Sequence, residues 1–134
     1  MARVEIVVSA VVLTDDRGRI LTVRKRGTQR FMLPGGKPEA GESALAAAVR
    51  ECAEELRVEL AADSLRELGV YAAPAANEAD TEVRATVFEH PQPWQLPLAP
   101  AAEIVELRWL DPGATLPDDL APLLCEQVLP ALRD

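Results

Sequence analysis

The sequence has few of the side chains that build nitrogen- and sulfur-based sites, since it contains one histidine and two cysteines. His90 stands beside a proline in a Pro-rich stretch, where a solvated side chain is more common than a catalytic one. Cys52 and Cys125 lie far apart and lack the Cys-x-x-Cys spacing of a metal site. We therefore expect both cysteines to be reduced thiols in the core of a cytoplasmic protein.

Long apolar runs are also missing. No run approaches the roughly 20 residues that span a bilayer, and the N-terminus enters strand-like sequence without the features of a signal peptide. Neither a membrane segment nor export is indicated. The composition, 49% hydrophobic and 27% charged, is that of a folded globular protein. A length of 134 residues predicts one domain, residues 1–134, with a sizeable core.

Positive charge is scarce, with 14 Lys and Arg against 22 Asp and Glu and a net charge of -8. Phosphate backbones are held by surplus Lys and Arg, so stable nucleic-acid binding is not expected. A small phosphorylated ligand stays compatible with this charge if a divalent cation lies between the carboxylates and the phosphate oxygens.

The hydrophobic pattern predicts two strands, a helix, further strands and a last helix. A turn at Asp15–Gly18 predicts that the first two strands form a hairpin, and the first strand, which is nearly all apolar, is expected to be buried on both faces. The last helix is expected to start at Pro117. This order indicates an α+β sandwich with a mixed sheet. The expected strands are Val4–Leu13, Arg19–Val23, Ser64–Ala72, Thr81–Glu89 and Ala102–Leu110.

The stretch Gly35–Val58, between the second and third strands, combines residues that favour a loop with a cluster of acidic residues. Two glycines and Pro38 predict a loop, after which Ser43 can cap a helix over Ala44–Leu56. At about 100° per residue, Leu45, Val49, Cys52 and Leu56 share a side that we expect to face the core.

The opposite side of this helix carries Glu51, Glu54 and Glu55. Each like-charged pair costs about 0.2 to 0.5 kcal/mol. Arg50 can pair with Glu54, but one guanidinium does not neutralise three carboxylates, whereas Mg²⁺ or Mn²⁺ with oxygen ligands would. A solvated acidic helix face is the alternative interpretation.

The spacing separates these two interpretations. From Gly36, five residues lead to Glu42, seven more lead to Arg50-Glu51, and two further positions precede Glu54-Glu55. This pattern resembles the signature of the Nudix hydrolases. Cys52 stands at an apolar position of the signature, which suits a small buried side chain. Arg57 replaces the usual glycine, so we expect the helix to run a turn longer than a left-handed end would permit.

The resemblance implies a Nudix-like α/β/α sandwich with a mixed central sheet and a loop-helix signature motif. It implies hydrolysis of a pyrophosphate bond in a nucleoside diphosphate linked to another group, with Mg²⁺ or Mn²⁺ as cofactor. By position in the signature, the metal ligands are Glu51, Glu54, Glu55 and the carbonyl of Gly35. Glu51 is also a candidate general base, while Glu42 and Arg50 can pair and hold the loop against the helix.

Residues outside the acidic helix complete the expected site. A later carboxylate often adds a ligand in such sites, and Glu103 is preferred over Glu89. The basic residues Arg24, Lys25 and Arg30 flank the loop, which itself carries Lys37. We expect them to meet phosphate oxygens; a solvated strand end is the alternative.

The choice of substrate rests on length alone. A compact chain looks more like a MutT-type nucleoside triphosphate pyrophosphohydrolase, acting on ordinary or oxidised nucleotides, than like the longer ADP-ribose enzymes. The alternatives are an ADP-ribose or nucleotide-sugar pyrophosphatase, a dinucleoside polyphosphate hydrolase, and a regulatory module that binds nucleotide without turnover. A homodimer remains open.

Overall fold

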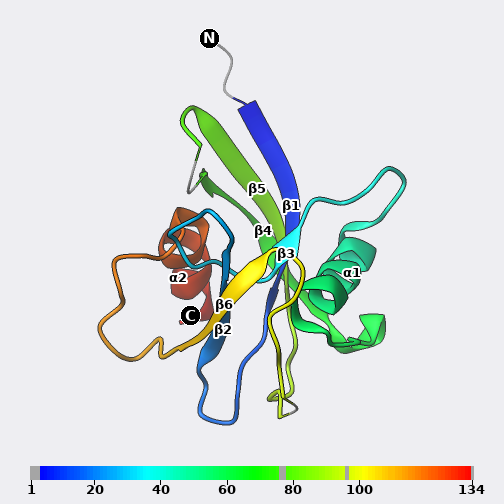
Figure 1. The fold of residues 1–134 in the computed structure, drawn as a ribbon, viewed down its shortest axis with the longest axis vertical. Helices are drawn as coiled ribbons and strands as arrows, with labels where there is room; N and C mark the ends of the chain where they lie inside the picture. The colour runs from blue at the N-terminus through cyan, green and yellow to red at the C-terminus, as the bar shows by residue number, and fades with distance from the viewer. Residues whose placement is uncertain (1–3, 76–77, 96, 134) are drawn as a thin grey trace.

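Six strands in two sheets form the centre of the fold (Figure 1) in the computed structural model, which describes residues 4–75, 78–95 and 97–133. The strands are β1 (Val4–Val12), β2 (Ile20–Lys25), β3 (Gly35–Gly36), β4 (Arg66–Pro74), β5 (Thr81–Glu89) and β6 (Ile104–Leu110). The helical segments are α1 (Ala44–Leu56), the 3-10 turn η1 (Ala62–Ser64), the π-helical η2 (Leu123–Val128) and α2 (Leu129–Leu132).

The larger sheet has the order β3-β1-β5-β4 and is mixed, because β1 pairs parallel with β5 while β3 and β4 pair antiparallel with their neighbours. The smaller sheet pairs β2 with β6 antiparallel. The strand predicted over Thr81–Glu89 has the bounds of β5, and the predicted mixed sheet is confirmed.

Two buried clusters lie on opposite sides of these sheets, which gives the predicted α/β/α sandwich. Along β1 the side chains alternate. Val11 belongs to the cluster under α1, together with Cys52, and Val12 belongs to the cluster under η2 and α2, together with Val128. None of the helices in the described part of the chain has the length and apolar character needed to cross a membrane.

The first strand is less buried than its composition predicts. Val4 is 58% exposed and Val7 is 51% exposed, whereas Ala10, Val11 and Val12 are buried. The expectation of burial on both faces is therefore wrong for the N-terminal half of β1. Only its C-terminal half is covered, because α1 packs against the end of the sheet where β3 pairs with β1 (Figure 1).

The predicted hairpin is only partly formed. The turn after β1 is present, since Thr14 and Ile20 form a bridge and the Leu21 N–H donates to the Leu13 carbonyl at 2.9 Å. Beyond this turn β2 leaves β1 and pairs with β6. Leu21 and Val23 are fully buried under α1, so β2 is held by core packing and by a partner that lies about 85 residues away in the chain.

Helix α1 begins at the predicted residue, but it does not run the extra turn that the sequence predicts. The Ser43 hydroxyl accepts from the Ala46 N–H at 3.0 Å. At the other end Arg57 takes the left-handed conformation, φ 56° and ψ 41°, and its N–H donates to the Ala53 carbonyl. The expectation of a longer helix is wrong. A non-glycine residue in this conformation costs about 1 to 2 kcal/mol, and the reversal lets Val58 reach the core, where it is buried.

The last helical segment starts later than expected. Its first turn follows Pro122, so the stretch from Pro117 to Ala121 is a connection rather than a helix. Leu124, Val128 and Leu129 are buried in the cluster that packs on the sheet. Cys125 is only half-buried and, like Cys52, is a free thiol.

Candidate active site

A cavity of about 580 Å³ lies where the loop before α1 meets the larger sheet and the C-terminal helical segment. Part of its wall is polar and comes from the signature stretch and two flanking segments. Much of the rest is aliphatic and comes from β1, β5 and η2, from the end of β4 and from the segment before β3. The polar lining includes Lys25, Gly35, Gly36, Lys37, Glu39, Arg50, Glu51 and Glu103; the aliphatic lining includes Ile6, Val8, Leu33, Val83, Leu123 and Leu124.

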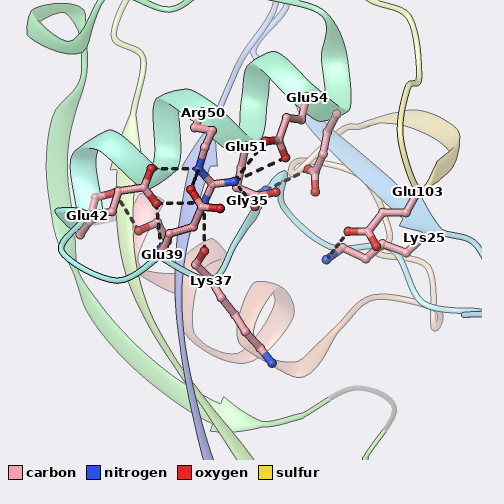
Figure 2. Close-up of polar contacts among 12 residues, drawn as sticks. Lys25, Gly35, Lys37, Glu39, Glu42, Arg50, Glu51, Glu54 and Glu103 are labelled. Carbon is pink, nitrogen blue, oxygen red and sulfur yellow. Dashed lines mark hydrogen bonds and ion pairs between the residues drawn. The ribbon is translucent and has the colours of Figure 1, made fainter.

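Arg50 holds the signature loop against α1 (Figure 2). Its Nε donates to Glu42 Oε2 at 2.8 Å and its Nη2 to Glu42 Oε1 at 2.9 Å. Nη2 also donates to the Lys37 carbonyl at 3.1 Å. The hydrogen bonds from Arg50 lower the pKa of Glu42 to about 2. Because a forked pair fixes orientation as well as energy, the predicted pairing of Glu42 with Arg50 anchors the loop.

The same guanidinium contacts the acidic face. Arg50 Nη1 donates to Glu51 Oε1 at 2.9 Å and to Glu54 Oε1 at 3.3 Å. Its Nε also lies 3.4 Å from Glu39 Oε1. Glu39, which sequence reasoning missed, could have been found as a carboxylate three positions before Glu42. Arg50 therefore neutralises part of the repulsion that the helix sequence predicts.

The Glu51 carboxylate lies against the backbone of Gly36. A Cβ built at position 36 would stand 2.5 Å from Glu51 Cδ and 2.7 Å from each carboxylate oxygen. Only glycine leaves room for this position. The neighbouring Gly35 is needed for another reason, because a Cβ there would stand 2.0 Å from the Ser9 carbonyl oxygen of β1.

Glu55 departs from the sequence prediction. The sequence predicts it on the side of the helix opposite the core, but it is 1% exposed. The Gly35 N–H donates to Glu55 Oε1 at 3.1 Å, and Oε2 is buried with no hydrogen-bond partner. Burial raises the pKa of Glu55 to about 8, although the Gly35 N–H opposes the rise. The physical reason is that the buried stripe of α1 runs through Ala48, Cys52 and Glu55, which are spaced as neighbours on one helix face.

The side chains present fit a hard divalent cation. Within residues 4–75, 78–95 and 97–133 no three acidic, Cys or His side chains converge into a complete cation site, and Glu51 and Glu54 face Arg50 instead. All candidate donors are oxygens, as Mg²⁺ and Mn²⁺ prefer. A buried carboxylate oxygen without a partner is costly, and a cation bound at Glu55 Oε2 would remove that cost.

Glu103 lines the cavity from the segment before β6. Its Oε1 lies 3.3 Å from Lys25 Nζ at the end of β2 (Figure 2), and both residues line the cavity. Glu89, the alternative carboxylate, pairs instead with Arg66 of β4 and is absent from the cavity lining.

The fold places only two of the four basic residues predicted to bind phosphate in the cavity lining. Lys25 and Lys37 line the cavity, whereas Arg24 and Arg30 do not. Arg24 pairs with Glu106 at 3.0 Å, and Arg30 donates to the Leu120 carbonyl at 3.0 Å. Successive strand side chains point to opposite faces, which separates Arg24 from Lys25, and Arg30 braces the connection before η2.

A profile of the NUDIX domain matches residues 4–128. A protein from Bacillus subtilis (strain 168), whose name proposes an 8-oxo-dGTP diphosphatase, is 30% identical over 103 residues, 77% of this chain. The chain spans 64% of the length of that relative.

Solved structures share the fold. The MutT protein from Methanosarcina mazei Go1 superposes with a TM-score of 0.68 at 20% identity, covering 89% of both chains. The MutT NUDIX hydrolase from Burkholderia pseudomallei superposes with a TM-score of 0.70 at 24% identity, covering 87% of this chain and 89% of the other. With its profile match over most of its length and its loop-helix signature in place, this chain belongs to the Nudix hydrolase family.

Proposed function

We propose that this chain is a divalent-cation-dependent pyrophosphohydrolase that acts on a nucleoside diphosphate linked to another group. The substrate that we propose in the first place is a nucleoside triphosphate, which includes oxidised forms. The products are then a nucleoside monophosphate and pyrophosphate. The supporting observation is that one cavity joins Arg50 and Glu51 of the signature, together with Glu103 and two lysines, to an aliphatic wall. Such a cavity suits a ligand with a charged phosphate chain and a flat, largely apolar base.

A divalent cation in this site would be held by Glu51, Glu54 and Glu55, with Glu103 and the Gly35 carbonyl as further oxygen donors. When bound, the cation supplies neutralising charge for the phosphate oxygens in the transition state. The remaining work belongs to side chains and backbone of this chain, and most of that work is positioning.

Glu51 is the proposed general base. It takes a proton from a water molecule, the water oxygen forms a bond to phosphorus, and the bridging P–O bond breaks with its electron pair leaving on the departing phosphate group. Arg50 holds the Glu51 carboxylate by the 2.9 Å hydrogen bond, and Glu42 holds Arg50. Lys25 and Lys37, both in the cavity lining, would donate to phosphate oxygens.

The test is a hydrolysis panel with Mg²⁺ or Mn²⁺. It includes 8-oxo-dGTP, the four ordinary deoxynucleoside triphosphates, ADP-ribose, a nucleotide sugar and a dinucleoside polyphosphate, with products separated by ion-exchange chromatography. We expect monophosphate and pyrophosphate from a triphosphate. Glu51→Gln should lose this activity, and Glu59→Gln, the same change at an exposed position on the chain after α1, should keep it.

Other outcomes would redirect or refute the proposal. Preferred turnover of ADP-ribose or a dinucleoside polyphosphate would keep the reaction type and replace the substrate. Nucleotide binding without turnover of any compound, at millimolar metal, would refute the proposed catalysis and favour a regulatory module.

A further inference from the structure

The ammonium of Lys25 pairs with Glu103, one of the proposed cation ligands. Its Nζ is 3.3 Å from Glu103 Oε1, and the two side chains are 28% and 56% exposed (Figure 2). A positive charge of the chain itself is therefore paired with a carboxylate that is a proposed cation ligand.

The backbone around this pair is fastened on both sides. The Arg26 N–H donates to the Glu103 carbonyl at 2.8 Å, next to the register shift at the end of β2. On the other side the Ala101 N–H donates to the Glu55 carbonyl at 2.9 Å, which ties the Glu103 segment to the last turn of α1. The main chain of Glu103 is thus held in place, and only its exposed side chain has freedom to change partner.

We propose that Lys25 is a built-in competitor of the divalent cation for Glu103. Without metal the Lys25 ammonium pairs with the Glu103 carboxylate. When a divalent cation binds, Glu103 exchanges Lys25 for the cation, and the freed ammonium faces the phosphate chain. This inference rests on the proposed function, because it assigns Glu103 to the cation of that reaction.

The unpartnered Glu55 Oε2 supports this exchange. This buried carboxylate oxygen accepts no hydrogen bond, so the pairing of Lys25 with Glu103 leaves part of the acidic site unsatisfied. A divalent cation carries twice the charge and binds several oxygens at once. The lysine is therefore a weak occupant that the cation can displace.

The experiment is a double-mutant cycle on Mn²⁺ affinity, measured on the full chain without substrate by the electron paramagnetic resonance signal of free Mn²⁺. The variants are Lys25→Met, Glu103→Gln and the double variant. Methionine keeps the aliphatic stem and removes the charge. Breaking an exposed ion pair changes an equilibrium constant by about two- to fivefold. We expect Lys25→Met to tighten Mn²⁺ binding by that factor and Glu103→Gln to weaken it.

The decisive result is the effect of Lys25→Met in the Glu103→Gln background. Competition predicts that the gain disappears there, whereas general charge repulsion predicts the same gain in both backgrounds and would overturn the inference. Lys37→Met is the matched control, because Lys37 lines the same cavity with no ion pair among the described residues; its effect should not depend on Glu103.

The two proposals fail in different ways. If the wild-type chain binds no Mn²⁺ and hydrolyses nothing, the proposed function fails and this inference with it. If the wild-type chain binds Mn²⁺ and hydrolyses nucleotide but the cycle is additive, or Glu103→Gln leaves Mn²⁺ affinity unchanged, only the exchange at Lys25 is refuted. Thermal melts of all variants without metal confirm that each is folded.

Discussion

Replacing Gly36 by alanine should remove activity while leaving the fold intact. The added Cβ would stand 2.5 Å from Glu51 Cδ, and ordinary contact begins near 3.4 Å, so the carboxylate must move by nearly an ångström. The obstructed atoms are the far end of a flexible side chain, so this movement is inexpensive. Gly36 is not in the left-handed conformation, which means that alanine adds no backbone strain.

The two effects have different expected sizes. A misplacement of about 1 Å at a reacting group can cost about 10²-fold in rate, which corresponds to about 2.7 kcal/mol of transition-state stabilisation. Alanine also lowers the entropy of the unfolded chain, which stabilises by about 0.4 to 1 kcal/mol. We therefore expect kcat/KM of Gly36→Ala to fall about 100-fold while Tm changes by less than about 5 °C.

The assay is steady-state hydrolysis of the preferred triphosphate together with a thermal melt. Gly18→Ala is the control with the opposite profile, because Gly18 has φ +76° in the turn after β1 and an added Cβ meets no atom within 4 Å. It should lose about 1 kcal/mol of stability from left-handed strain and keep full activity. If Gly36→Ala retains its full kcat/KM, the position of Glu51 beside Gly36 is not the one used in the reaction.

The remaining predictions concern three carboxylates. Glu51→Gln should stay about 10² to 10⁴-fold slower even at saturating Mg²⁺, as expected for a lost general base; recovery at high metal would make Glu51 a ligand only. The Glu55 pKa is raised from 4.5 to about 8, so its ionisation destabilises the metal-free fold increasingly from pH 4.5 to pH 8. Without metal, Glu55→Gln should therefore melt higher than wild type at pH 8 and equally at pH 4.5 in parallel thermal scans; equal melting at both pH values would contradict the raised pKa. The Glu42 pKa is lowered from 4.5 to about 2, so its pairing with Arg50 stabilises fully above pH 4.5 and is lost as pH falls to 2. Chemical denaturation of Glu42→Gln should show a deficit that shrinks over this range, and a deficit independent of pH would argue against the ion pair.

Local features of the signature stretch could be predicted because they depend on neighbours in the chain. Ser43 caps α1, since its hydroxyl needs only the N–H three positions on. Glu42 and Arg50 meet because Glu42 directly precedes the cap of α1 and Arg50 lies about two helix turns further on. The strands over β1, β5 and β6 also follow from runs of apolar and β-branched residues.

Burial of Glu55 could not be predicted from its helix alone. Glu54 and Glu55 are adjacent in sequence, yet Glu54 is half exposed and Glu55 is buried. The difference depends on how α1 is rotated against β1 and β3, which long-range packing decides. The Gly35 N–H that receives Glu55 comes from another segment of the chain, and no pattern within α1 contains it.

The sequence by itself determined the loop-helix motif, the order of most elements and which oxygen atoms are candidate ligands, because helix caps, periodicity and residue spacing act over a few positions. The tertiary structure alone decided that β2 pairs with β6, that Lys25 reaches the cavity while Arg24 and Arg30 do not, and that Arg57 ends the helix in a left-handed turn. Each of these outcomes depends on segments far apart in the chain competing for the same core, a competition that local propensity does not encode.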